Sequence, residues 1–137
     1  AGLAIDANGT TDAETLADFP YAINGLTYTL TSGDGDVKLD DNTVADGYTA
    51  LFLACVDAEG TITVVKGDEV DNDDITAKDT GIHWPEPTEA TCPIGAIKIK
   101  NASGSVFTGG TTALTGVSGV TVTYYNLFTV PVEPLTS

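Results

Sequence analysis

The stretch YTALFLACVDAEGTITVVKG, residues 48–67, decides the fold. Its first part, Tyr48 to Val56, is apolar at consecutive positions, which is typical of a strand that is buried on both faces. DAEG follows as a turn sequence, and from Thr61 to Val65 apolar and polar side chains then alternate. The stretch therefore predicts a β-hairpin whose first strand lies in the middle of a sheet.

Three further stretches show the two-residue period of strands. They are Leu26–Ser32, Ile94–Asn101 and Val120–Leu127. In the second, Ile97 and Ile99 alternate with Lys98 and Lys100. The chain also has 22 threonines and 15 glycines among 137 residues, a composition that favours strands and tight turns over helices. We expect an all-β fold, arranged as a β-sandwich or a jelly-roll-like pair of sheets.

The length of the chain suits a single domain. We expect the β-domain to span residues 19–128, with a long acidic excursion over residues 68–92, which lack alternation and contain two prolines. Thr11–Glu14 fits a capping box, so residues 1–18 are expected to form either a short helix or an N-terminal arm. Residues 129–137, with two more prolines, are expected to form an extended C-terminal tail.

The charge is strongly negative and unevenly distributed. The chain has a formal net charge of −15, and of its 20 acidic residues only Glu133 follows Cys92. It has no arginine, so nucleic acid is not expected as a partner, because such binding depends on neutralising phosphates. No segment approaches the roughly 20 apolar residues of a membrane-spanning helix, so no membrane is expected either. The nearly neutral final third is where a protein partner would meet least repulsion.

Acidic clusters raise the question of calcium, which binds six to eight oxygen ligands. One cluster contains Asp71, Asp73 and Asp74, and the other lies within residues 34–42. Neither follows the spacing of an EF-hand loop. We interpret both as solvated acidic loops, and we expect no metal and no other cofactor.

The sequence offers little for catalysis. His83 is the single histidine, and no sequence motif pairs it with a nucleophile. We interpret Cys55 and Cys92 as free thiols, although a bridge between them is an alternative. We therefore do not expect an enzyme. An alternative function is a carbohydrate-binding module, in which aromatic side chains would form a platform for sugars: Tyr48, Trp84, Tyr124 and Tyr125.

Most of the chain resembles a known class of viral protein. The resemblance runs from about Phe19 to Leu127 and rests on three segments that follow one another in this order: LACVDAEGTITVVKG, then HWPEPTEATCP, then IGAIKIKNASGSVFTGGTTALTGVSGVTVTYYNL. Together they resemble the small head-decoration, or capsid cement, proteins of tailed bacteriophages and related virion structural proteins.

The resemblance implies a structural protein of the virion. Such a protein binds the exterior of an assembled capsid through the major capsid protein, often as a homotrimer, and reinforces contacts between capsomers. A bacterial surface adhesin or pilus-like subunit remains an alternative, and a tail or fibre component belongs to the same class.

The contact with the capsid is expected around a loop in the neutral third of the chain. We expect Phe107 to be its apolar anchor, since a central aromatic side chain often dominates an interface. The residues expected to accompany it are Lys98, Lys100, Thr108, Gly109, Gly110 and Thr111.

Overall fold

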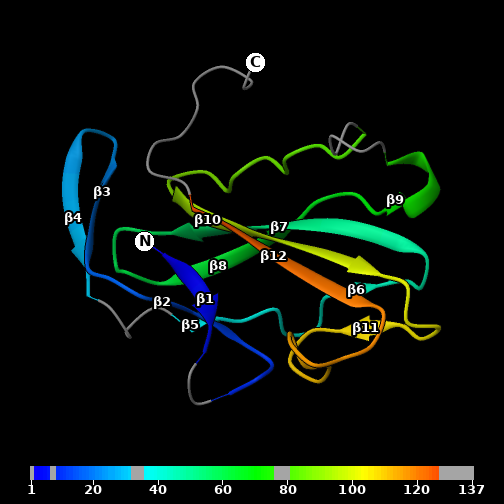
Figure 1. The fold of residues 1–137 in the computed structure, drawn as a ribbon. Helices are drawn as coiled ribbons and strands as arrows, with labels where there is room; N and C mark the ends of the chain where they lie inside the picture. Colours follow the sequence, from blue (N-terminus) through cyan, green and yellow to red (C-terminus); the bar gives the residue numbers. More distant parts are fainter. Residues whose placement is uncertain (1, 7–8, 32–35, 76–80, 127–137) are drawn as a thin grey trace.

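The structure, a computed structural model, describes residues 2–6, 9–31, 36–75 and 81–126. The described chain is all-β, as the composition predicts, and its sheets are antiparallel (Figure 1). The strands are β1 (Leu3–Ile5), β2 (Ala13–Thr15), β3 (Phe19–Ile23), β4 (Leu26–Leu30), β5 (Asp36–Val37), β6 (Thr43–Val44), β7 (Tyr48–Val56), β8 (Ile62–Lys66), β9 (Val70–Asp71), β10 (Cys92–Asn101), β11 (Phe107–Thr108) and β12 (Val120–Asn126), and a short 3-10 turn, η1, spans Asn72–Asp74. Among these residues no helix is long and apolar enough to cross a membrane.

The largest sheet is built around β7, as the opening stretch predicts. Its strands follow the order β12-β10-β7-β8, and β9 pairs with the start of β7. Every residue of β7 after Tyr48 is buried, so the prediction of a central strand that is covered on both faces is confirmed. The predicted hairpin is also confirmed, because β8 pairs with β7 from Val56↔Ile62 to Phe52↔Lys66.

Three small sheets contribute to the core on the inner face of this large sheet. They have the orders β1-β2-β5, β11-β6 and β3-β4. In Figure 1 the β3–β4 hairpin stands at one side, β1, β2 and β5 lie below the large sheet, and β6 and β11 lie below its other end. The main core joins side chains from all four sheets, among them Leu3, Tyr21, Val44, Phe52 and Ile97.

The opposite, outer face of the large sheet carries a second, smaller apolar cluster. Leu53, Cys55 and Ala96 are buried there, and Val65 and Tyr125 pack against them. Residues of the 81–91 segment lie over this face. A Cβ atom added at Gly67 would stand 3.5 Å from the carbonyl oxygen of His83 and from Pro85. This covering explains how β7 is buried on both sides.

The predictions for the N-terminal segment are wrong. Thr11–Glu14 does not begin a helix, since Ala13–Thr15 is strand β2, and it pairs with both β1 and β5. Nor are residues 1–18 an arm outside the domain, because Leu3 and Ala13 are part of the main core. A capping box contributes little to a short isolated helix, whereas burial of alternate side chains stabilises a strand.

The excursion over residues 68–92 holds β9 and η1 at its start, so it is not wholly irregular. The predicted tail at 129–137 lies outside the described residues.

Strand β3 was not predicted, although Asn24-Gly25, a strong signal for a two-residue hairpin turn, follows it directly.

A bulge in β10 brings the N-terminal strand onto the sheet. Pro93 pairs with Cys55 and Gly95 with Ala54, so Ile94 is the extra residue. A Cβ atom at Gly95 would overlap the Leu3 side chain and lie 2.9 Å from the carbonyl oxygen of Tyr125. The missing side chain at Gly95 is therefore what lets Leu3 pack against β10.

We predict that Gly95→Ala lowers the free energy of unfolding by about 1–3 kcal/mol, the usual cost of forcing extra volume into a packed core. Denaturant unfolding measures this difference. Gly9→Ala is the matched control, because its added Cβ would meet only Asp6 Oδ2, at 3.5 Å. If the two variants were equally stable, Gly95 would not be required for the packing of Leu3.

Candidate functional site

The predicted interface anchor, Phe107, belongs to the core. Its side chain is 1% exposed, and β11 pairs it with Val44 of β6. The prediction that Phe107 binds a partner is therefore wrong, because its ring is already used in folding. Gly109 is buried as well, and a Cβ atom there would overlap the backbone of Leu39.

The other predicted interface residues do not form one surface. Gly110 and Thr111 are exposed in a tight turn in which the amide of Thr111 donates to the carbonyl of Thr108 at 3.1 Å. Lys98 and Lys100 alternate with the core residues of β10, so they lie on the outer face of the large sheet, whereas β11 contributes to the core on its inner face. The large sheet separates the lysines from the turn.

The predicted acidic metal candidates form a turn. Asp71 caps η1, and its Oδ1 accepts a hydrogen bond from the amide of Asp73 at 2.9 Å. Asp71, Asp73 and Asp74 are all exposed. Across the described ranges, no group of three or more His, Cys, Asp or Glu side chains is placed to hold a metal ion.

The residues considered for catalysis are far from reactive geometry. His83 is exposed, and Cys55 is buried in the outer-face cluster. Burial raises the pKa of the Cys55 thiol, which disfavours the nucleophilic thiolate. Cys92 packs against the main core on the other face of the sheet, and both cysteines are free.

The four aromatic residues weighed as a sugar platform are dispersed. Trp84 and Tyr125 meet edge to face, with ring centroids 5.9 Å apart, and Lys98 Nζ lies 5.9 Å from the Tyr125 centroid. Tyr124 packs against the main core on the opposite face, and Tyr48 begins β7, where it pairs with Asp71. Only Trp84 and Tyr125 are brought together, so a four-residue platform does not form.

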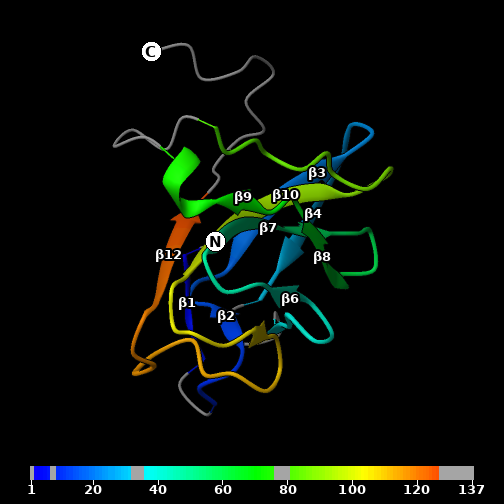
Figure 2. The same ribbon diagram turned by 90° about the vertical axis from the view of Figure 1, so that its right-hand side faces the viewer.

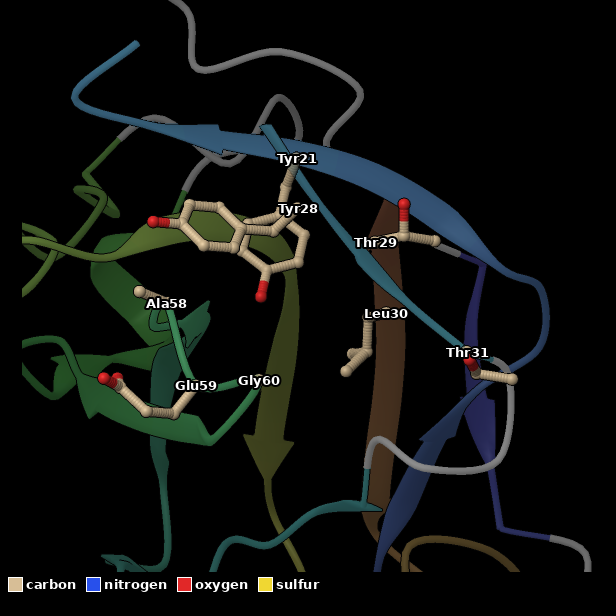
Figure 3. Close-up of a pocket in the computed structure, with 8 residues that line it drawn as sticks. All are labelled: Tyr21, Tyr28, Thr29, Leu30, Thr31, Ala58, Glu59 and Gly60. Atoms are coloured by element: carbon tan, nitrogen blue, oxygen red, sulfur yellow. The ribbon is translucent and has the colours of Figure 1, made fainter. Parts of the chain in front are cut away.

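A groove that the sequence did not predict lies between the β3–β4 hairpin and the turn after β7 (Figure 3). Its volume is about 420 Å³, and eight residues line it: Tyr21, Tyr28, Thr29, Leu30, Thr31, Ala58, Glu59 and Gly60. The rings of Tyr21 and Tyr28 stack with centroids 5.5 Å apart. The Tyr21 hydroxyl donates to the carbonyl of Asp57 at 2.8 Å, and burial raises its pKa. This hydrogen bond connects the β3–β4 hairpin to the turn after β7, so a contact within the fold fixes the two walls of the groove relative to each other.

The most highly connected buried polar side chain in the described chain is Asn101, at the end of β10. It is fully buried, and its Nδ2 donates to the carbonyls of Val44 at 3.0 Å and Ser105 at 2.7 Å. Its Oδ1 accepts from the amide and the hydroxyl of Ser103 at 3.2 and 2.8 Å. Asn101 thus fixes the start of the exposed 102–106 loop to β6. The Asn-x-Ser sequence after a strand is a turn signal that could have pointed to it.

We predict that Asn101→Ala lowers the free energy of unfolding by about 2–5 kcal/mol, because the buried carbonyl of Val44 loses its donor and the side chain's hydrogen bonds to Ser103 and Ser105 are lost as well. Thermal or denaturant unfolding measures the loss. The control is Asn42→Ala, which removes one exposed hydrogen bond to the carbonyl of Asp40. A loss at Asn101 as small as that at Asn42 would contradict the structural role of this side chain.

Asp12 is placed unfavourably for a charge. Its Oδ1 is buried and makes no hydrogen bond within the described residues. Burial raises the pKa of Asp12 above its ordinary 3.8, and the carboxylates of Asp40, Asp36 and Asp6 raise it further, against a smaller lowering by Lys38. The folded state therefore favours protonated Asp12.

Because the pKa is raised on folding, the stability that protonated Asp12 contributes is fully present below 3.8 and is lost as the pH rises through the folded-state pKa. We predict that Asp12→Asn raises the midpoint of thermal unfolding at neutral pH and that this gain disappears below 3.8. Asp41→Asn, at an exposed turn, is the control for the change in net charge. A gain that persisted unchanged into acid would show that ionisation of Asp12 is not its cause.

In comparisons with protein families, curated proteins and solved structures, no match to the chain was found.

Proposed function

We propose that this chain is a structural protein of a tailed-bacteriophage virion, which binds the exterior of the assembled capsid and reinforces contacts between capsomers. Its partner is the major capsid protein, and it acts by binding, without covalent chemistry. The proposal joins the resemblance of residues 19–127 to head-decoration proteins with one physical feature of the described chain.

That feature is the partition of charge along the described chain. Residues 92–126, which form β10, β11, β12 and their loops, contain Lys98 and Lys100 and no acidic residue. The remaining described strands lie in the part of the chain that carries 19 of the 20 acidic residues. A protein that coats a particle benefits from this arrangement, since an acidic portion favours solvent and a neutral portion adds no repulsion of its own toward a partner. The nearest carboxylate to the 102–106 loop that a hydrogen bond places is Asp46, whose Oδ1 accepts from the amide of Gly104 at 2.9 Å.

We propose that the exposed loops within residues 92–126, the neutral part, contact the capsid. The 102–106 loop is exposed and anchored by Asn101, and the turn at Gly110 and Thr111 is also exposed. Small residues in these loops let another backbone approach closely. In finer detail, we propose that the large sheet and the three small sheets form a sandwich-like arrangement that carries these loops.

The experiment is a sedimentation assay of purified protein with capsids that lack it. We expect the chain to sediment with intact capsids at a fixed ratio to the major capsid protein. Ser105→Glu combined with Thr111→Glu adds one negative charge to each of the two proposed contact elements, at exposed positions. We expect about a tenfold weaker affinity, equivalent to about 1.4 kcal/mol.

Thr27→Glu combined with Thr29→Glu, at two exposed positions of β4, makes the same change in net charge and is the matched control, which should bind like the unmodified chain. A chain that stayed in the supernatant with every capsid preparation, and was absent from purified phage, would contradict the proposal. Equal weakening by the control would show that net charge, and not the neutral part, determines binding.

A further inference from the structure

Among the described strands, β12 is an edge strand of the large sheet. Within the described residues it pairs only with β10, from Gly95↔Asn126 to Asn101↔Val120. Figure 2 shows β12 at the outside of the molecule, with no described strand beyond it. The backbone amides and carbonyls of alternate residues along this strand therefore face away from β10.

The sequence of β12 lacks the features that usually protect an edge. Its residues, VTVTYYN, include no charge, no proline and no glycine, and most are β-branched or aromatic. Such an edge readily pairs with another strand. At the other edge of the large sheet, β8 carries Lys66, which forms an ion pair with Glu69 at 2.6 Å. In the separate β3–β4 sheet, the edge strand β3 carries Pro20.

The other uncharged edge strands are shorter than β12, and β1, β6 and β11 have only two or three residues each. Strand β4, LTYTL, pairs only with β3 among the described strands. It is shorter than β12, however, and the groove beside it includes Glu59. A second acidic chain would meet more repulsion at β4 than at β12.

We propose that β12 pairs with β12 of a second copy of this chain, in antiparallel orientation across a twofold axis. A second copy is chosen as the partner of β12 because of how charge is distributed along the chain. Any copy carries a formal net charge of −15, so two copies associate best through segments without carboxylates. Strands β10 and β12 form such a segment, and an isologous contact brings it together with itself.

The register that uses the whole strand places Thr123 opposite Thr123. Val122 then lies opposite Tyr124 on the inner face, and Thr121 lies opposite Tyr125 on the outer face. Pairs of aromatic and β-branched residues are favourable across antiparallel strands. Val122 and Tyr124 are partly buried and pack against the main core of their own copy. In the dimer, the same residues of the second copy bury more of their apolar surface. The two large sheets become one continuous sheet.

The inference does not rest on the proposed function, and it differs from the trimer that the resemblance implies. A twofold β12 contact closes after two copies, whereas a trimer needs a head-to-tail contact. The test therefore uses purified protein alone, in the absence of capsids.

Sedimentation equilibrium over a range of concentrations measures the association. We expect a monomer–dimer equilibrium that is strengthened by added salt, because salt screens the remaining carboxylates. Thr123→Glu should weaken dimerisation by about tenfold or more, since it places two carboxylates directly opposite each other. Within one copy the new side chain lies across from Lys98, which favours folding.

Thr29→Glu, an exposed position of β4, is the control with the same change of charge and should dimerise like the unmodified chain. Thr123→Lys supplies the complementary variant, and an equimolar mixture of Thr123→Lys and Thr123→Glu should restore dimers. Unfolding of each variant by heat confirms that it is folded.

Three results would overturn the proposal. The first is a monomer at all concentrations up to about 1 mM, which corresponds to an association weaker than about −4 kcal/mol. The second is a trimer. The third is a dimer that Thr123→Glu leaves intact or that Thr29→Glu disrupts equally.

Discussion

The pairing of β7 with β10 is the contact on which the rest of the structure depends. In the large sheet, β10 pairs with β7 on one side and with β12 on the other, and β7 also pairs with β8 and β9. Side chains of both strands supply the centre of the main core, including Phe52, Ile97 and Ile99, and all three are fully buried. The bulge at Ile94 makes room for Leu3, and Asn101 at the other end of β10 holds β6 and the 102–106 loop. Each small sheet therefore depends on the placement of this pair.

The strands that sequence could predict are the longer ones. β8, β10 and β12 contain a two-residue period, because their side chains point alternately to the two faces of the large sheet. β7 is instead a run of consecutive apolar residues, because both of its faces are covered. The short strands β1, β2, β5, β6 and β11 are two or three residues long, so no period can be read from them. They form because core side chains such as Val37 and Val44 need partners far along the chain, which local sequence does not reveal.

The candidate site was predicted less well than the fold, for a related reason. Phe107 was expected to be an interface anchor because it is an aromatic residue within the neutral third, but its ring is buried in the core. The small residue Gly109 beside it lets the chain pass close to Leu39. Lys98 and Lys100 were grouped with Phe107 because they are near in sequence, although alternation along β10 directs them to the opposite face. The distribution of charge, by contrast, could be read directly from the sequence. It is the feature that links the proposed binding to a capsid with the proposed pairing of β12 edges.

Native-state hydrogen exchange tests the central role of β7 and β10 most directly, because the slowest amides report the last part of a protein to open. We expect the slowest exchange in the ladder from Thr49↔Lys100 to Val56↔Cys92, with faster exchange in the β3–β4 hairpin and in β1 and β2. If the amides of β3–β4 or β1–β2 were as slow as those between β7 and β10, the fold would not depend on this pair of strands.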